Sequence, residues 1–328
     1  MHTTGQTTTL SRRGALRLLG LAGLAPTFQA WGQDYPSRTV NLIVPQTAGG
    51  AADRLARILA ERLEPRWKRS VIVENRPGGG VVVGSTALAR ANHDGHTIGL
   101  LGSSLSINAV QRSDLPYDAV RDFTPLARLG YYTTVLVADK SLPAQDIPAL
   151  VALAKRQPGK LSFGSNGIGT AAQLAGELLN STAGIDLLHV PYNGAAKLYT
   201  DMVGGLIPLG FAVASSAAPF VKAGQLKVLG VTSAQRSPLF PDWPAIAETY
   251  PGYEAVNWAG LCGPAGVPPA VADRISSDLV ALLKEEHVGR QMADMGFEVA
   301  TLPPQEFGRF IRSEIQRFAK VTRPVSEK

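Results

Sequence analysis

Residues 39–63, TVNLIVPQTAGGAADRLARILAERL, decide the fold. An apolar strand over residues 40–44 runs into a turn with two consecutive glycines, and a helix follows. The glycines let the backbone take positive φ, while the first amides of the helix lack intrahelical partners and lie at the positive end of its dipole. The stretch therefore predicts a site for an anion, with a carboxylate expected, to which the dipole alone contributes about 0.3–2 kcal/mol. An ordinary strand-to-helix turn is the alternative interpretation.

The same design recurs in a second stretch of the chain. A strand over residues 161–163 leads into GSNGIGT, residues 164–170, and then into a helix whose apolar spacing buries one face. Two such helix starts, one in each domain, would hold an anionic ligand from both sides. Two serines at 103–104 also follow a strand, at the end where open parallel sheets bind ligands. The candidate ligand-binding residues from this reasoning are Gln46, Thr47, Ala48, Gly49, Gly50, Ala51, Ala52, Asp53, Ser103, Ser104, Ser165, Asn166, Gly169 and Thr170.

Alternating strand and helix patterns run through most of the chain, which predicts an α/β fold with mostly parallel sheets. Apolar runs at residues 133–137 and 254–263 are interpreted as crossings between two domains. The expected division is residues 33–136 with 256–328 in one lobe and residues 137–255 in the other. After the return crossing the remainder is predicted to be helical. A second glycine run, residues 78–80, also precedes a helix and is interpreted as structural.

Composition and charge are those of a soluble globular protein rather than a nucleic-acid binder. The 328 residues include 32 basic and 26 acidic side chains, a formal net charge of +6. Arg12, Arg13 and Arg17 lie in the first 32 residues, so 32 − 3 = 29 basic side chains remain against 26 acidic ones. Because no basic run is interleaved with aromatic residues, a nucleic-acid partner is not expected. We expect a monomer.

Residues 1–32 have the pattern of an export signal. Paired arginines precede an apolar run over residues 18–25, and Ala30-Trp31-Gly32 has the small-x-small form of a cleavage site. The run is too short to span a bilayer, so a removed signal is preferred to an uncleaved anchor. The paired arginines resemble a twin-arginine signal, although Ala15 stands where that signal usually has a large apolar residue.

Several features argue against catalysis or a metal site. Cys262 is the only cysteine and lies in an apolar run, so neither a disulfide nor a cysteine-based metal cage is expected. The two histidines of residues 93–96 flank a turn and lack further ligands. The pattern Gly167-x-Gly169-x-x-Ala172 resembles a dinucleotide fingerprint, but the next strand does not end in the required acid. No nucleophile-elbow motif is found. An exported enzyme therefore remains only an alternative, and no cofactor is predicted.

A family resemblance extends from about residue 35 to residue 321. The sequence resembles the Bug family, the periplasmic substrate-binding proteins of tripartite tricarboxylate transporters. Order and spacing over nearly the whole chain make the match specific, rather than any single motif. The matching runs are residues 35–38 (YPSR), 45–53 (PQTAGGAAD), 73–78 (VENRPG), 94–95 (DG), 115–118 (LPYD), 122–125 (DFTP), 158–161 (PGKL), 189–192 (HVPY), 231–233 (VTS) and 264–266 (PAG).

The resemblance implies a two-lobed periplasmic binding protein fold of type II, with each lobe a mixed, mostly parallel sheet flanked by helices. It implies a small organic acid or amino acid held between the lobes, delivery to a membrane transporter and no catalysis. A role as the ligand-reporting partner of a membrane sensor remains open. The two turns already singled out are the family's ligand loops, and Asp53 is expected to cap its loop, because carboxylates repel an anion. The resemblance adds Gln173, Tyr192, Phe211 and Ala212 to the candidate site.

Departures from the family pattern concern the ligand. Residues 46–48, QTA, replace a phenylalanine-proline pair and a small residue, and Ala51 stands where relatives often carry a hydroxyl. Gln173 replaces a common histidine. Ala212 follows Phe211 where the family has an acid, so a partner for a ligand ammonium is missing. Since a buried ammonium without a counter-charge is costly, the sequence predicts a preference for carboxylates that lack an amine.

Overall fold

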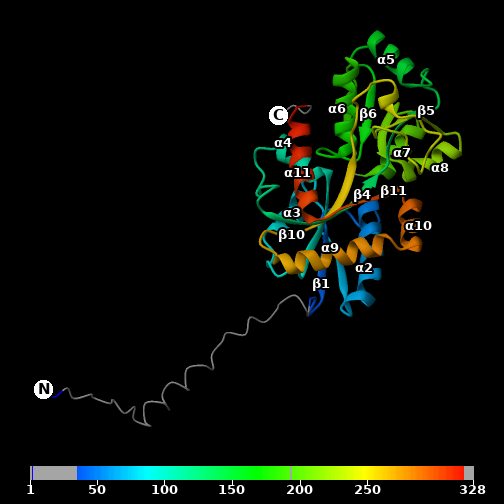
Figure 1. Ribbon diagram of the computed structural model, residues 1–328. Helices are drawn as coiled ribbons and strands as arrows, with labels where there is room; N and C mark the ends of the chain where they lie inside the picture. The colour runs from blue at the N-terminus through cyan, green and yellow to red at the C-terminus, as the bar shows by residue number, and fades with distance from the viewer. Residues whose placement is uncertain (1, 3–34, 193, 321–328) are drawn as a thin grey trace.

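A computed structural model describes residue 2, residues 35–192 and residues 194–320. The predicted export signal therefore lies outside the described residues, apart from His2. Two separate sheets, of six and five strands, divide the described chain into two lobes, one above the other in Figure 1. No helix among the described residues has both the length and the apolar character that a membrane span requires.

The six-stranded sheet of the first lobe has the order β11-β4-β10-β3-β1-β2. β1 lies between β2 and β3 and pairs in parallel with both. β10 pairs antiparallel with both β3 and β4. β11 is an antiparallel edge strand beside β4. The strands are β1 (Val40–Val44), β2 (Val71–Asn75), β3 (Thr97–Gly102), β4 (Phe123–Tyr132), β10 (Asn257–Pro264) and β11 (Phe297–Leu302).

Both faces of this sheet are covered, because alternate side chains of a strand point to opposite faces. Leu42 of β1 joins a core cluster with α2, α9 and α10, whereas its neighbour Ile43 joins a cluster with α3, α4 and α11. The helices are α2 (Ala51–Trp67), α3 (Val82–Ala89), α4 (Ser103–Gln111), α9 (Pro269–Leu283), α10 (Glu286–Asp294) and α11 (Pro304–Ala319).

The five-stranded sheet of the second lobe has the order β7-β6-β8-β5-β9. β6 pairs in parallel with β7 and β8, and β5 pairs antiparallel with β8 and β9. One core cluster lies under α5 and α6, and another under α7 and α8. The elements are β5 (Thr134–Asp139), α5 (Ile147–Arg156), β6 (Ser162–Ser165), α6 (Ala171–Ala183), β7 (Leu188–Pro191), α7 (Ala195–Val203), β8 (Leu209–Val213), α8 (Ala214–Lys222), β9 (Leu226–Val231) and the 3-10 helix η1 (Ile246–Glu248).

The structure differs from the sequence prediction in the elements α4, α8 and β11 and in the relative direction of the strands. The sheets are mixed, as expected, but parallel pairings do not outnumber antiparallel ones, because the strands next to each lobe crossing pair antiparallel. The remainder after the return crossing is not all helical, since β11 lies there; its side chains are mostly half-exposed, so it lacks the apolar run of a buried strand. α4 and α8 begin where only strand ends were expected.

The chain passes between the lobes twice. β4 of the first sheet is followed by Thr133 and then at once by β5 of the second sheet. The return runs from β9 through residues 232–256 to β10, which lies in the middle of the first sheet. At the crossing, the N–H of Thr232 donates to the carbonyl of Thr134, and the N–H of Ala255 donates to the carbonyl of Thr232. The two crossings are therefore hydrogen-bonded to each other.

Candidate functional site

The carboxyl ends of the parallel strands of the two lobes face each other. In the first lobe β1, β2 and β3 end beside one another, and in the second lobe β7, β6 and β8 do so. The loop after β6 reaches the first lobe: a Cβ added to Gly169 would lie 2.6 Å from Oδ1 of Asn108 on α4. A Cβ added to Gly80 would lie 3.1 Å from the carbonyl oxygen of Ile168. Both predicted ligand loops thus lie at these facing edges.

The first loop, residues 46–50, is open to solvent over most of its length. Thr47, Ala48, Gly49 and Gly50 are exposed, and Gly49 has φ of +82°, a conformation that favours glycine. α2 begins at Ala51 with Gly50 as its N-cap, and no side chain caps it there. The first-turn amides of α2 are therefore not covered by a side-chain cap. Gln46 lies at the base of the loop, where its carbonyl accepts from Nδ2 of Asn75.

Asp53 caps the first loop, as predicted. Its Oδ2 accepts hydrogen bonds from the N–H of Gly49 at 2.9 Å and from Nε of Arg57 at 3.0 Å. The residue is only 3% exposed. Burial alone would raise the pKa of Asp53, but hydrogen bonds from Arg57, Gly49 and Asn75 outweigh it and hold the pKa below its ordinary value. The carboxylate therefore fixes the turn and occupies the Gly49 amide.

This cap predicts a pH-dependent contribution to stability. Because the folded-state pKa of Asp53 is depressed, its contribution is present above the ordinary value of 3.8 and is lost as the pH falls through the folded pKa. We expect Asp53→Asn to lower the free energy of unfolding by about 1–3 kcal/mol at pH 7. Denaturant unfolding between pH 7 and pH 2 should show this difference from the wild type shrinking in acid. A difference that stays constant over that range would contradict the assignment.

The second loop is held by side chains from its own helix. Thr170 is the N-cap of α6: its Oγ1 accepts from the N–H of Gln173 at 3.3 Å and donates to the carbonyl of Gly167 at 2.7 Å. Oε1 of Gln173 accepts from the N–H of Gly169 at 2.7 Å. Gly169, with φ of +72°, is buried, whereas Asn166 and Ile168 are exposed. The hydroxyl of Thr170 and the amide of Gln173 thus organise the turn.

Ser165 contributes to the same loop from the end of β6. Its side chain has no exposed surface, and its Oγ accepts from the N–H of Gly167 at 3.1 Å and lies 2.7 Å from Nε2 of His189. Burial lowers the pKa of His189 to about 4, so its imidazole is neutral at physiological pH. These two residues were not paired from the sequence, because two neighbouring strands bring them together. The buried hydroxyl shapes the loop rather than facing solvent.

Two other candidates lie where their side chains serve the fold. The phenyl ring of Phe211 is fully buried in the core of the second lobe, 5.6 Å from the ring of Phe163, so this side chain packs in the core and its role at the ligand stays a prediction. Its direction follows from strand alternation, which points Phe211 to one face of the sheet and Ala212, also buried, to the other. Val213, at the end of β8, packs against the core cluster of the first lobe.

The remaining candidates differ in exposure. Oγ of Ser103, a buried residue, donates to the carbonyl of Val256 at 2.9 Å and accepts from the N–H of Trp258 at 2.9 Å, so this hydroxyl binds the return crossing. The adjacent Ser104 is half-buried. Tyr192 is also half-buried, and its N–H donates to the carbonyl of Ser165. A Cβ added to Gly164 would lie 3.1 Å from the ring of Tyr192.

Sequence reasoning missed the surface of the first lobe that meets the second loop. The glycine run at residues 78–80 was interpreted as structural, yet Gly80 faces Ile168 across the interface. Nδ2 of Asn108 donates to the carbonyl of Gly80 at 2.7 Å, so α4 and the glycine run form one surface. Next to it Ile107, Ala171, Leu174 and Phe318 form a small apolar cluster that joins the lobes. No local sequence signal pairs these segments, because they are distant in the chain.

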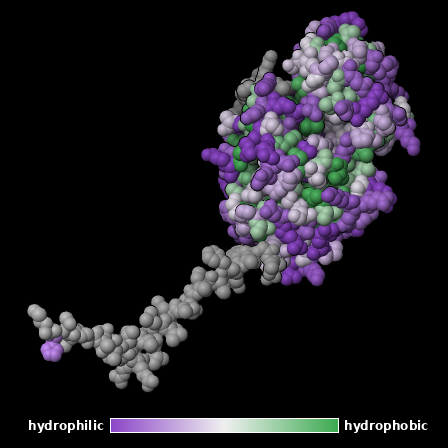
Figure 2. Space-filling model, in the orientation of Figure 1, coloured by the Kyte–Doolittle hydropathy of each residue, from purple (hydrophilic) through white to green (hydrophobic). Residues whose placement is uncertain are grey.

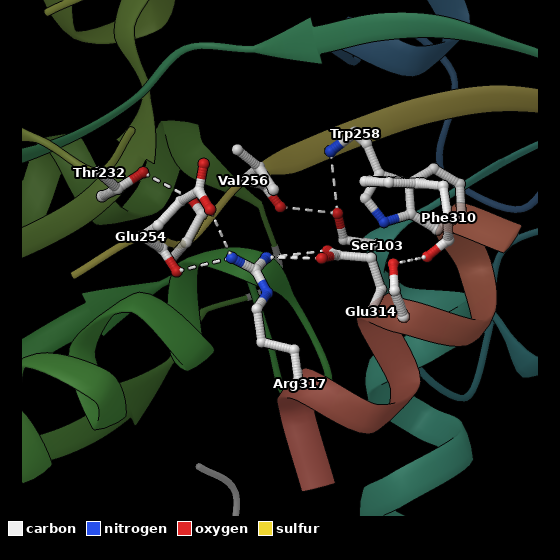
Figure 3. Close-up of polar contacts among 10 residues, drawn as sticks. Ser103, Thr232, Glu254, Val256, Trp258, Phe310, Glu314 and Arg317 are labelled. Atoms are coloured by element: carbon white, nitrogen blue, oxygen red, sulfur yellow. Dashed lines mark hydrogen bonds and ion pairs between the residues drawn. The ribbon is translucent and has the colours of Figure 1, made fainter. Parts of the chain in front are cut away.

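Side chains of α4 and α11 hold the return crossing in place (Figure 3). Ser103 lies between Val256 and Trp258, and Nη1 of Arg317 contacts Oε2 of Glu254 at 2.9 Å. Nη2 of Arg317 contacts Glu314, which is 4% exposed.

A cavity of about 330 Å³ lies between the two crossings and is lined by residues 131–134, 232–236, 238, 254–256 and 298. None of the predicted ligand-binding residues lines this cavity.

The part of the chain that the structure describes contains no candidate metal centre. Within residues 35–192 and 194–320, no group of three or more His, Cys, Asp or Glu side chains could hold a metal ion. Cys262 is buried, and burial raises the pKa of its thiol. Figure 2 shows hydrophobic residues around the middle of the visible face, between more hydrophilic upper and lower parts.

Known proteins share both the sequence and the fold. The family "Tripartite tricarboxylate transporter family receptor" matches residues 55–326. Protein BugT of Bordetella pertussis is 31% identical over 313 residues, 94% of this chain and 95% of that protein. An R. palustris protein solved with adipate is 30% identical, with a TM-score of 0.81 over 88% of this chain and 97% of that one. MatC from Rhodopseudomonas palustris with bound malate is 26% identical, with a TM-score of 0.78 over 88% and 99%.

Proposed function

The chain belongs to the receptor family of tripartite tricarboxylate transporters, and on this premise we propose that it captures a small carboxylate without an amine between the facing loops of its lobes. It is a periplasmic solute-binding protein with two lobes, not an enzyme. We propose that it acts as a monomer and that residues 1–32 direct its export, with Arg12-Arg13 as a twin-arginine signal. The receptor role implies membrane transporter partners.

The observation that carries this proposal is the contact of the second loop with the first lobe. Gly169 abuts Asn108, and Gly80 abuts Ile168, so the second loop meets the elements that follow the parallel strands of the first lobe. The exposed loop at residues 47–50 leads into a helix start without a side-chain cap. Amides there, at the positive end of the dipole of α2, suit a carboxylate. Asp53 and Gln173 occupy the Gly49 and Gly169 amides, so we propose other amides of the two loops as the donors.

Lobe closure is the second part of the proposal. We place the hinge at Thr133 and at residues 254–256, where the chain changes sheet. The test is a thermal-shift screen with adipate, malate, succinate and glutarate, followed by small-angle scattering with the acid that binds. A ligand at 100 times its Kd should add about 2.7 kcal/mol of stability. No shift with any of these acids would reject the ligand class, and a shift without compaction would reject the hinge.

The lack of an acid after Phe211 predicts discrimination against amino acids. Ala212 and Val213 offer no counter-charge at the end of β8, and an unpaired buried ammonium is costly. The solved relatives hold adipate and malate, which carry no amine. We expect succinate and glutarate to bind at least about tenfold more tightly than aspartate and glutamate, a difference of roughly 1.4 kcal/mol. Calorimetry measures both pairs, and tighter binding of the amino acids would refute the preference.

A further inference from the structure

Three residues spaced by four, running from the second loop into α6, form a hydrogen-bonded relay. The N–H of Gly169 donates to Oε1 of Gln173 at 2.7 Å, and Nε2 of Gln173 donates to Oε1 of Glu177 at 2.6 Å. Gln173 is 6% exposed, so water has little access to replace these bonds. The relay connects the loop that touches the first lobe to a carboxylate two helical turns away.

Glu177 decides which end of the Gln173 amide faces the loop. A carboxylate only accepts hydrogen bonds, so it must take the NH₂ end of the amide. The carbonyl end is then turned toward the N–H of Gly169, which only donates. Were the amide reversed, two donors would meet at Gly169 and an oxygen would meet the carboxylate. Both contacts would be lost at a buried position, where unpaired polar groups are destabilising.

In the first lobe the N–H of the loop glycine is also bound by a side chain four residues on, but without such a relay. There the N–H of Gly49 donates directly to the carboxylate of Asp53, also four residues on, and Arg57, four residues further, donates to the same oxygen. An aspartate has no wrong end, so its orientation needs no further partner. The second lobe has an amide in the equivalent place, and only Glu177 removes its ambiguity.

We propose that Glu177 is a positioning residue for the ligand, which acts through Gln173 to hold the Gly169 turn against the first lobe. A shift of the turn would change its contact with the first lobe, because the Cα of Gly169 lies so close to Asn108 that no Cβ fits between them. A loosened amide at Gly169 shifts this contact surface and weakens ligand binding. The proposal rests on the proposed function, because it assigns the second loop to the ligand.

The test exchanges the two side chains of the relay. In Glu177→Gln the second amide can either donate or accept, so the orientation of Gln173 is no longer enforced. Combining Glu177→Gln with Gln173→Glu restores it in inverted order, because a carboxylate at 173 accepts from both Gly169 and the amide at 177. This double exchange reproduces the arrangement of Gly49 and Asp53 and keeps the total charge. Glu306→Gln, at an exposed position of α11, is the matched control for loss of one carboxylate.

Two measurements are made on each full-length variant: the ¹H–¹⁵N resonance of Gly169 without ligand, and the Kd for adipate by calorimetry. We expect Glu177→Gln to move the resonance and to raise the Kd about tenfold, roughly 1.4 kcal/mol. The double exchange should recover most of that loss, and Glu306→Gln should change neither quantity. An unchanged Gly169 resonance in Glu177→Gln, or a double exchange that recovers none of the lost affinity, would overturn the proposal. Failure of the wild type to bind adipate would count against the ligand class alone, because the resonance tests the relay without ligand.

Discussion

Replacing Gly169 with leucine is expected to abolish the thermal stabilisation that a bound carboxylate provides. The added Cβ would lie 2.6 Å from Oδ1 of Asn108, so the side chain pushes the second loop away from the first lobe. The positive φ of +72° adds a backbone cost of about 1–2 kcal/mol for any L-residue with a side chain. At 100 times the wild-type Kd, the ligand-induced gain of about 2.7 kcal/mol should fall to near zero.

Gly184 provides the matched control for this prediction. It is the C-cap residue of α6, at the other end of the same helix, and it has φ of +63°. A Cβ added there meets nothing within 4 Å. Gly184→Leu should therefore carry a similar backbone cost while keeping the ligand-induced shift. If both variants kept the shift, the second loop would not contact the ligand; if both lost it, the effect would be one of general stability.

Phe211→Ala is expected to lower the free energy of unfolding by about 3–5 kcal/mol. The ring is fully buried in the second lobe and packs edge-on against Phe163 at 5.6 Å, so truncation leaves a cavity in the core. Phe211→Leu should cost much less, because it refills most of the volume. Denaturant unfolding measures both losses.

This prediction also separates a core role from a ligand role. If Phe211 only packs in the core, Phe211→Leu keeps the Kd for adipate close to that of the wild type. A large loss of affinity with little loss of stability would place the ring at the ligand instead. Leu206, which is 76% exposed, supplies the control: Leu206→Ala should change the free energy of unfolding by less than about 0.5 kcal/mol.

The sequence predicted those parts of the site that depend on neighbours along the chain. The glycine turns after β1 and β6 were found because strand, glycine and helix start are consecutive. The capping role of Asp53 was predicted because a carboxylate repels an anion, and its partner Gly49 lies only four residues away. Ser103 could not be interpreted in this way, since its hydrogen-bond partners Val256 and Trp258 are distant in the chain.

Other features of the site depend on which face of a sheet a residue takes. Phe211 was assigned to the site by the family resemblance, and alternation along β8 places its ring in the core. The approach of Gly80 and Asn108 to the second loop is a property of the lobe interface. A single sequence contains no local signal for that approach. The share of antiparallel pairing was underestimated for a related reason, because pairing partners such as β10 and β3 are distant in the chain.

The place of β10 in the first sheet has a consequence for how the protein is made. This strand lies between β4 and β3, so the first sheet is interrupted until residues 257–264 have been synthesised. The second sheet, in contrast, is assembled from one continuous segment, residues 134–231. During vectorial synthesis, the middle of the chain can complete its sheet before the beginning can. The sheet that contains the amino-terminal strands can therefore be completed only after the last quarter of the polypeptide has been synthesised.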